Sequence, residues 1–251
     1  MSDHPRPSLP RRVVAEGLGT ALLVATVVGS GIMGETLAAG NMAVALLANT
    51  IATGAALVAL ILTFGSISGA HFNPVVTLAD AALGGIRWRD VAPYVVAQFV
   101  GGLIGTACAN VMFGKAIFFA SRHVRAGGAQ IFSELVATFG LLTVIWGCNR
   151  SRPTATPFAV ASFITAAYWF TSSTSFANPA VTLARTASDT FAGIRPADAP
   201  AFIGIQLVGA AAAVLLFRWL FRHEPMLAER PIVATLSVEE AHEDRPVRMH
   251  P

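Results

Sequence analysis

Two Asn-Pro dipeptides are the residues of this chain best suited to act on a solute. They are Asn73-Pro74 and Asn178-Pro179. Asn is a favoured N-cap residue and Pro suits the first helical turn, so each dipeptide predicts the start of a helix. The amide side chain and the free N–H groups at a helix N-terminus can donate hydrogen bonds to a solute oxygen. The positive end of the helix dipole is unfavourable for cations, so the chemistry offered is passage of uncharged, oxygen-bearing solutes.

Both dipeptides belong to an internal repeat, because each is followed by the same pattern, Asn-Pro-x-Val-Thr-Leu-Ala. A glutamate, Glu16 or Glu134, precedes each one, and a Gln-x-Val-Gly pattern follows each one. Every half therefore has three long apolar segments and one short helix, expected to run to Ala82 or Ala187. An odd number of crossings turns the second half upside down, so the short helices should enter from opposite faces and meet near mid-membrane.

The composition points to lipid as the solvent of this chain. Of its 251 residues 54% are hydrophobic and only 12% are charged, whereas soluble domains carry about 25% charged residues. A membrane-spanning helix needs roughly 20 apolar residues. The six segments that predict such helices are Val13–Met33, Met42–Phe64, Val91–Phe113, Ile131–Cys148, Thr156–Thr171 and Ala199–Phe217. We therefore expect an all-α membrane protein.

The domain organisation follows from these segments. We predict a polar N-terminal tail over 1–12, a channel domain over 13–221 and a polar C-terminal tail over 222–251. The two halves of the channel domain should occupy about 13–113 and 129–221. Arg and Lys residues are more frequent on the side that holds both termini, which predicts cytoplasmic termini in a multi-pass protein of the bacterial inner (plasma) membrane.

The doubled Asn-Pro motif and the repeated Glu and Gln residues resemble the aquaporin and aquaglyceroporin family, from about Val13 to Phe217. The resemblance implies an aquaporin-like inverted repeat of six transmembrane helices plus two re-entrant half-helices. It also implies one pore in each subunit of a homotetramer, with small neutral solutes and water as the passing molecules.

Two positions depart from the family pattern. The first motif is Asn-Pro-Val, with Val75 in place of the usual Ala, while the second keeps Ala180. The residue after the second motif is Val181, where the family usually has the arginine of its selectivity filter. Counting from the motifs by the family's spacing gives Thr53, Ala166 and Ser175 as the other filter residues, and a one-residue slip would give Ala167 in place of Ala166.

A filter of this composition is wide and uncharged. Loss of a guanidinium removes up to five fixed donors and a positive charge. We therefore expect passage of glycerol, urea or neutral metalloid hydroxides such as arsenite, in addition to water. The change at Val181 resembles a bacterial branch of the family that is associated with arsenic resistance. An ordinary water or glycerol channel, in which Val181 has no special purpose, is the alternative.

Four further residues are candidates for roles around the pore. Arg185 lies one helical turn beyond Val181 and either faces the external vestibule or pairs with nearby Asp189. We expect His71 to line the cytoplasmic part of the pore. Glu16 and Glu134 could relay protons, but their symmetric recurrence favours support of the re-entrant loops, whose backbone groups need partners.

Other functions fit the sequence less well. A coupled secondary transporter usually needs a central ionisable site, and the spans offer little beyond the two glutamates. An intramembrane enzyme would need a nucleophile–base pair or metal ligands, and no such cluster is visible, so we expect no catalysis, cofactor or metal. Cys108 and Cys148 are predicted to be small buried apolar residues. No basic run suggests nucleic-acid binding.

Overall fold

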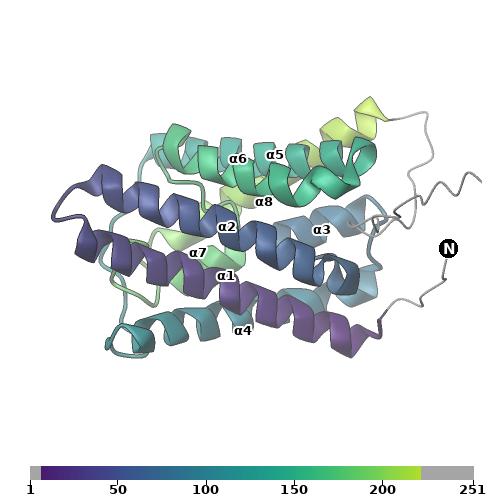
Figure 1. The fold of residues 1–251 in the computed structure, drawn as a ribbon. Helices are drawn as coiled ribbons and strands as arrows, with labels where there is room; N and C mark the ends of the chain where they lie inside the picture. Colours follow the sequence, from purple (N-terminus) through teal and green to yellow (C-terminus); the bar gives the residue numbers. More distant parts are fainter. Residues whose placement is uncertain (1–6, 222–251) are drawn as a thin grey trace, which may run out of the picture.

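The computed structural model describes residues 7–221, so the C-terminal tail predicted over 222–251 lies outside the described residues, as does 1–6 of the N-terminal tail. The described part of the chain contains eight α-helices and one short 3₁₀ helix, and no strand (Figure 1). In chain order they are α1 (Leu9–Leu37), α2 (Met42–Ser68), α3 (Pro74–Ala82), α4 (Trp88–Met112), α5 (Gly128–Ser151), η1 (Pro153–Ala155), α6 (Thr156–Phe170), α7 (Pro179–Arg185) and α8 (Ala199–Leu220).

Five helices of the described residues, α1, α2, α4, α5 and α8, are long and apolar enough to cross a membrane. The sixth predicted span, α6, has only 15 residues. At 1.5 Å per residue it is about 22 Å long, which is less than the ~30 Å hydrocarbon core of a bilayer. The helix α1 begins at Leu9, inside the predicted N-terminal tail, because Pro10 occupies its first turn.

The two halves of the chain use the same packing scheme. Helix α1 packs against α2 and α4, and α5 packs in the same way against α6 and α8. The halves meet where α2 packs on α6, α4 on α7 and α3 on α8. The short helices α3 and α7 lie between the long ones, towards opposite ends of the molecule (Figure 1).

Two glycines on α4 permit its close approach to α1. A Cβ atom at Gly101 would lie 2.2 Å from the carbonyl oxygen of Gly17, and one at Gly105 would lie 2.2 Å from that of Ala21. Small residues spaced four apart let helix backbones pack tightly in membranes. This pair therefore serves packing within the subunit.

The half-helices begin where the sequence predicts. Helix α3 also ends at the expected Ala82, but α7 ends at Arg185, two residues before the expected Ala187. The two cysteines differ from the prediction, since Cys108 is exposed and Cys148 is only partly buried. The helices that carry these cysteines turn apolar faces outward. An apolar residue on such a face does not need to be buried within its own chain.

Candidate functional site

The two Asn-Pro motifs meet end to end. The side chain of Asn73 accepts a hydrogen bond from the N–H of Val75, and that of Asn178 accepts from Ala180 and Val181. These bonds cap the half-helices. Proline lacks an N–H group, but it costs no hydrogen bond at the first helical position, because an N–H there has no partner within the helix.

The amide nitrogens of the two asparagines join the halves. The Nδ2 atom of Asn73 donates to the carbonyl of Ala177 at 2.8 Å, and Nδ2 of Asn178 donates to the carbonyl of Phe72 at 2.8 Å. An amide nitrogen carries two hydrogens, so each asparagine keeps one for another acceptor.

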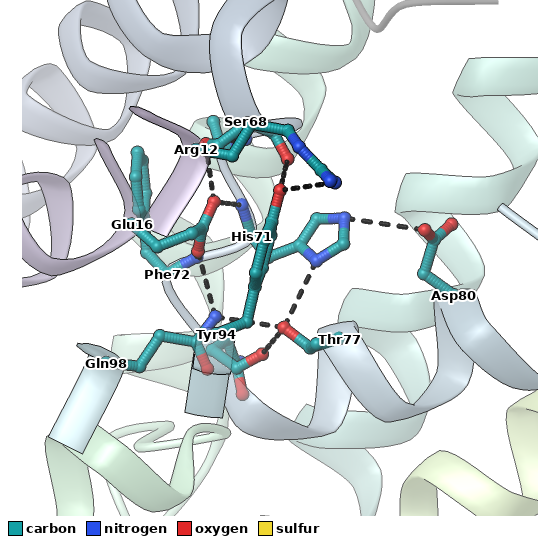
Figure 2. A network of polar contacts seen from close by, with 11 residues as sticks. Arg12, Glu16, Ser68, His71, Phe72, Thr77, Asp80, Tyr94 and Gln98 are labelled. Carbon is teal, nitrogen blue, oxygen red and sulfur yellow. Dashed lines mark hydrogen bonds and ion pairs between the residues drawn. The ribbon is translucent and has the colours of Figure 1, made fainter. Parts of the chain in front are cut away.

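A buried glutamate supports each loop that leads to an asparagine. Glu16 accepts hydrogen bonds from the backbone N–H groups of His71 and Phe72 at 3.0 and 2.7 Å, and from the Ser68 hydroxyl at 2.6 Å (Figure 2). Glu134 accepts from the N–H groups of Phe176 and Ala177, both at 2.8 Å. Both carboxylates therefore partner loop N–H groups that would otherwise be buried without an acceptor.

A glutamine and a threonine complete each network. The Nε2 atom of Gln98 donates to Glu16 and to Thr77 of α3. In the second half, Gln206 donates to Glu134 and to Thr182 of α7. The glutamine that recurs in the sequence repeat thus connects its own long helix to a glutamate and to a half-helix through hydrogen bonds.

The supported loops carry non-glycine residues in the left-handed region. They are Ala70 and Phe72 in the first loop, at φ of 50° and 49°, and Thr174, Ser175 and Ala177 in the second, at 61°, 49° and 45°. This conformation costs free energy for residues with a Cβ atom. The glutamates and the paired asparagines hold the loops in this shape.

A narrow cavity of about 100 Å³ runs past the two asparagines. Its lining extends from Asp80 on α3 to Arg185 on α7, and includes Asn73 and Asn178. Because α3 and α7 run away from their common meeting point, these charged residues mark opposite ends. We call them the α3 mouth and the α7 mouth. The lining combines the asparagines and their loops with aliphatic side chains, which include Leu57, Ile61, Leu141, Val160 and Ile164.

Three of the four predicted filter residues line this cavity, namely Thr53, Ser175 and Val181. The fourth is wrong. Ala166 is exposed on the outer face of α6 and does not line the cavity. The error comes from counting backward from Asn178, which assumes a fixed length for the loop between α6 and α7.

Tyr168, two residues further along α6, lines the cavity where Ala166 does not. It is buried, lines the cavity, and its hydroxyl lies 3.4 Å from Oγ1 of Thr53. Ile164, one turn before it, lines the same cavity. This i, i+4 spacing on α6 was the signal in the sequence that could have identified Tyr168.

Arg185 does not pair with Asp189. The carboxylate of Asp189 instead binds Arg122 at 2.8 Å, and hydrogen bonds from the Arg122 backbone and side chain lower the pKa of Asp189. Arg185 is buried, lines the cavity, and its Nε atom donates to the carbonyl of Ala192. At the α3 mouth, Nε2 of His71 lies 3.5 Å from Asp80 (Figure 2).

Comparison with known proteins agrees with this geometry. Residues 4–157 match the family model described as major intrinsic protein. The aquaglyceroporin AqpS of Rhizobium meliloti (strain 1021) is 53% identical over 233 residues, covering 93% of this chain and 97% of the relative. This chain belongs to the major intrinsic protein family. It is therefore a multi-pass membrane channel of the aquaporin and aquaglyceroporin type.

More distant members of the family share the fold. The probable aquaporin AqpM of Archaeoglobus fulgidus is 32% identical over 180 residues, which cover 64% of this chain and 71% of the relative. The X-ray structure of the aquaglyceroporin from Plasmodium falciparum superimposes with a TM-score of 0.61 at 19% identity, covering 86% of this chain and 97% of that one. Among residues 7–221 no cluster of three potential metal ligands occurs.

Proposed function

We propose that this chain is a passive channel for small uncharged hydroxylated solutes, together with water. The solutes that we propose are glycerol, urea and neutral metalloid hydroxides such as arsenite. The observation that supports this most strongly is the composition of the ring around the cavity at Val181. Its members Thr53, Tyr168, Ser175 and Val181 carry no charge, so the ring neither binds an ion nor narrows the passage with a guanidinium.

The mixed polar and aliphatic lining suits a polyol. The hydroxyl of Ser175 is buried without a hydrogen-bond partner among residues 7–221, and each asparagine keeps one free amide hydrogen. A solute can hydrogen-bond to these groups while its CH groups pack on the aliphatic side chains of the lining. Unpaired buried polar groups are costly, so an oxygen-bearing solute that satisfies them enters more readily than a hydrocarbon.

The relative described as an aquaglyceroporin supports glycerol as a solute. The extension to metalloid hydroxides rests on chemistry. A neutral trihydroxide presents several hydroxyl groups, as a polyol does, and the ring offers no charge to discriminate between them.

The membrane arrangement is part of the proposal. The channel domain spans 13–221, four copies form a homotetramer in the bacterial inner membrane, and both termini are cytoplasmic. The α3 mouth then opens to the cytoplasm and the α7 mouth to the outside. Large apolar side chains exposed along the long helices, such as Val96, Ile104 and Leu215, supply the surface for lipid and for neighbouring subunits.

The test is solute flux into proteoliposomes with the variant Val181→Arg. Wild-type vesicles should take up glycerol and arsenite faster than protein-free vesicles. The arginine variant should lose both fluxes and keep water permeation, because the guanidinium narrows the ring. Val181→Leu is the control for added bulk without charge.

Each outcome has a clear meaning. Unchanged flux in Val181→Arg would contradict the filter assignment, and wild-type flux no faster than that of empty vesicles would contradict the channel function. Glycerol uptake without arsenite uptake would support the ordinary water and glycerol channel. Uptake driven by a proton or sodium gradient would indicate a coupled transporter.

A further inference from the structure

Arg185 is a buried cation at the edge of the solute pathway. It is the last residue of α7 and lies one turn beyond Val181, on the same helix face. Its side chain is 2% exposed and lines the cavity. Only Nε has a protein hydrogen-bond partner among residues 7–221, the carbonyl of Ala192. The structure gives the other guanidinium N–H groups no hydrogen-bond partner among residues 7–221, so they can donate to a solute in the cavity that Arg185 lines.

An aromatic ring fixes the plane of this guanidinium. The Cζ atom of Arg185 lies 3.4 Å from the centroid of the Phe176 ring. Phe176 is itself held edge-on by Phe202, with centroids 5.4 Å apart. A second arginine, Arg125, stacks on the same ring at 5.0 Å. The α7 mouth thus has a rigid platform that carries two cations.

No carboxylate of the described residues forms an ion pair with Arg185. Glu134 lies behind the same loop, but its oxygens accept from Phe176, Ala177 and Gln206. The guanidinium of Arg125 is already engaged within the protein, because it donates to the carbonyls of Gly193, Ser173 and Phe191. Of the two arginines at the α7 mouth, Arg185 is therefore the one that lines the cavity and has no carboxylate paired with it among residues 7–221.

The opposite mouth shows that a half-helix does not require this arginine. Asp80 occupies the repeat position of Arg185, and His71 that of Phe176. Asp80 and His71 contact one another at the α3 mouth (Figure 2). The same framework therefore accommodates opposite charges, and the cation at the α7 mouth needs another explanation.

We infer that Arg185 is the charge filter of this channel, set one helical turn outward from the uncharged ring at Val181. The ring sets the width of the passage, and Arg185 rejects cations while donating hydrogen bonds to the oxygens of uncharged solutes. Width and charge selection are thus separated along the pathway. This inference rests on the proposed function as a channel for uncharged solutes.

Urea and the guanidinium ion form a matched pair of probes, because both are small and planar and differ mainly in charge. Proteoliposomes of wild type, Arg185→Gln and Arg185→Lys would be tested for uptake of each. Arg122→Gln is the control, since Arg122 is exposed at the same end of the molecule and paired with Asp189. Size-exclusion chromatography verifies the assembly of every variant.

Arg185→Gln should raise guanidinium uptake at least about tenfold, because a unit charge in a low-dielectric passage strongly alters the energy of another. Urea uptake should change by less than about threefold, since the ring is intact. Arg185→Lys and Arg122→Gln should exclude guanidinium as the wild type does. If Arg185→Gln does not fold, Arg185→Met replaces it, because a thioether packs well on an aromatic ring.

The double variant Val181→Arg, Arg185→Gln gives a second test. It moves the guanidinium into the ring, so it should exclude guanidinium and also block urea. Guanidinium exclusion that persists in folded Arg185→Gln, with urea still passing, would overturn the inference and leave the proposed function standing. Failure of the wild type to pass urea or glycerol would instead refute the proposed function.

Discussion

At the scale of single residues, the ring that we propose at Val181 combines hydroxyl groups with one aliphatic side chain. The hydroxyl of Tyr168 lies 3.4 Å from Oγ1 of Thr53, which itself donates to the carbonyl of Asn49. The hydroxyl of Ser175 has no hydrogen-bond partner in the described part of the chain. Tyr168 is the bulkiest of the four members, so it should limit the width of the ring more than Val181 does.

Tyr168→Ala should therefore increase glycerol and urea permeation. We expect a rise of about tenfold, which is the lower end of the discrimination that one methylene group gives in an apolar pocket. Stopped-flow light scattering of proteoliposomes measures the rate. Ala166→Leu is the matched control, because Ala166 is exposed on the other face of α6. If the two substitutions changed permeation equally, the choice of Tyr168 over Ala166 as a ring member would be wrong.

At the scale of elements, the half-helices depend on loops that a glutamate holds in an unfavourable conformation. In the second loop, Ser175 and Ala177 have positive φ, and the N–H groups of Phe176 and Ala177 have Glu134 as their acceptor. The loop therefore has little conformational preference of its own for the shape it adopts. Its geometry comes from α5, which carries Glu134.

Glu134→Ala should destabilise the protein strongly. Two buried N–H groups lose their acceptor, at a cost of about 1–3 kcal/mol each. The Tm in detergent should fall by roughly 5 °C or more, as followed by tryptophan fluorescence. Glu35→Ala, at an exposed position of α1, should leave the Tm unchanged. A Tm for Glu134→Ala close to that of Glu35→Ala would show that the carboxylate is dispensable.

At the scale of the whole molecule, charge is distributed unequally between the two mouths. The α7 mouth gathers cations from separate segments, with Arg125 before α5 and Arg185 at the end of α7. Burial lowers the pKa of Arg125 to about 10, so it stays charged at neutral pH. His123 lies beside them, and its pKa is lowered by burial and then by the charges of Arg125 and Arg185.

Acid should weaken the fold through His123. His123 binds a proton less readily in the folded state than in the unfolded chain, where its pKa is about 6.5. The contribution of His123 to the free energy of unfolding therefore keeps its full value above that pH and decreases as the pH falls below it. Asp189 opposes the effect only in part. Tm measured from pH 7.5 to 5 should decline less in His123→Gln than in the wild type. Parallel curves would exclude this histidine as the source.

Much of the fold could be predicted from local signals in the sequence. The Asn-Pro motifs determined where α3 and α7 begin, because N-caps and helical prolines act on neighbouring residues. The repeat paired Glu16 with Glu134, and apolar runs located the spanning helices. Chemistry that depends on a few adjacent residues can be predicted from their order along the chain.

Only the tertiary structure decided which side chains meet across the cavity. It placed Tyr168 at the cavity and Ala166 on the exposed face of α6, because two residues along a helix turn the side chain to a different face. It also paired Asp189 with Arg122 and placed the guanidinium of Arg185 over the Phe176 ring. These contacts form because the segments 113–127 and 186–198 fold together over α7. Such contacts depend on the lengths and paths of connections, for which the sequence carries no periodic signal.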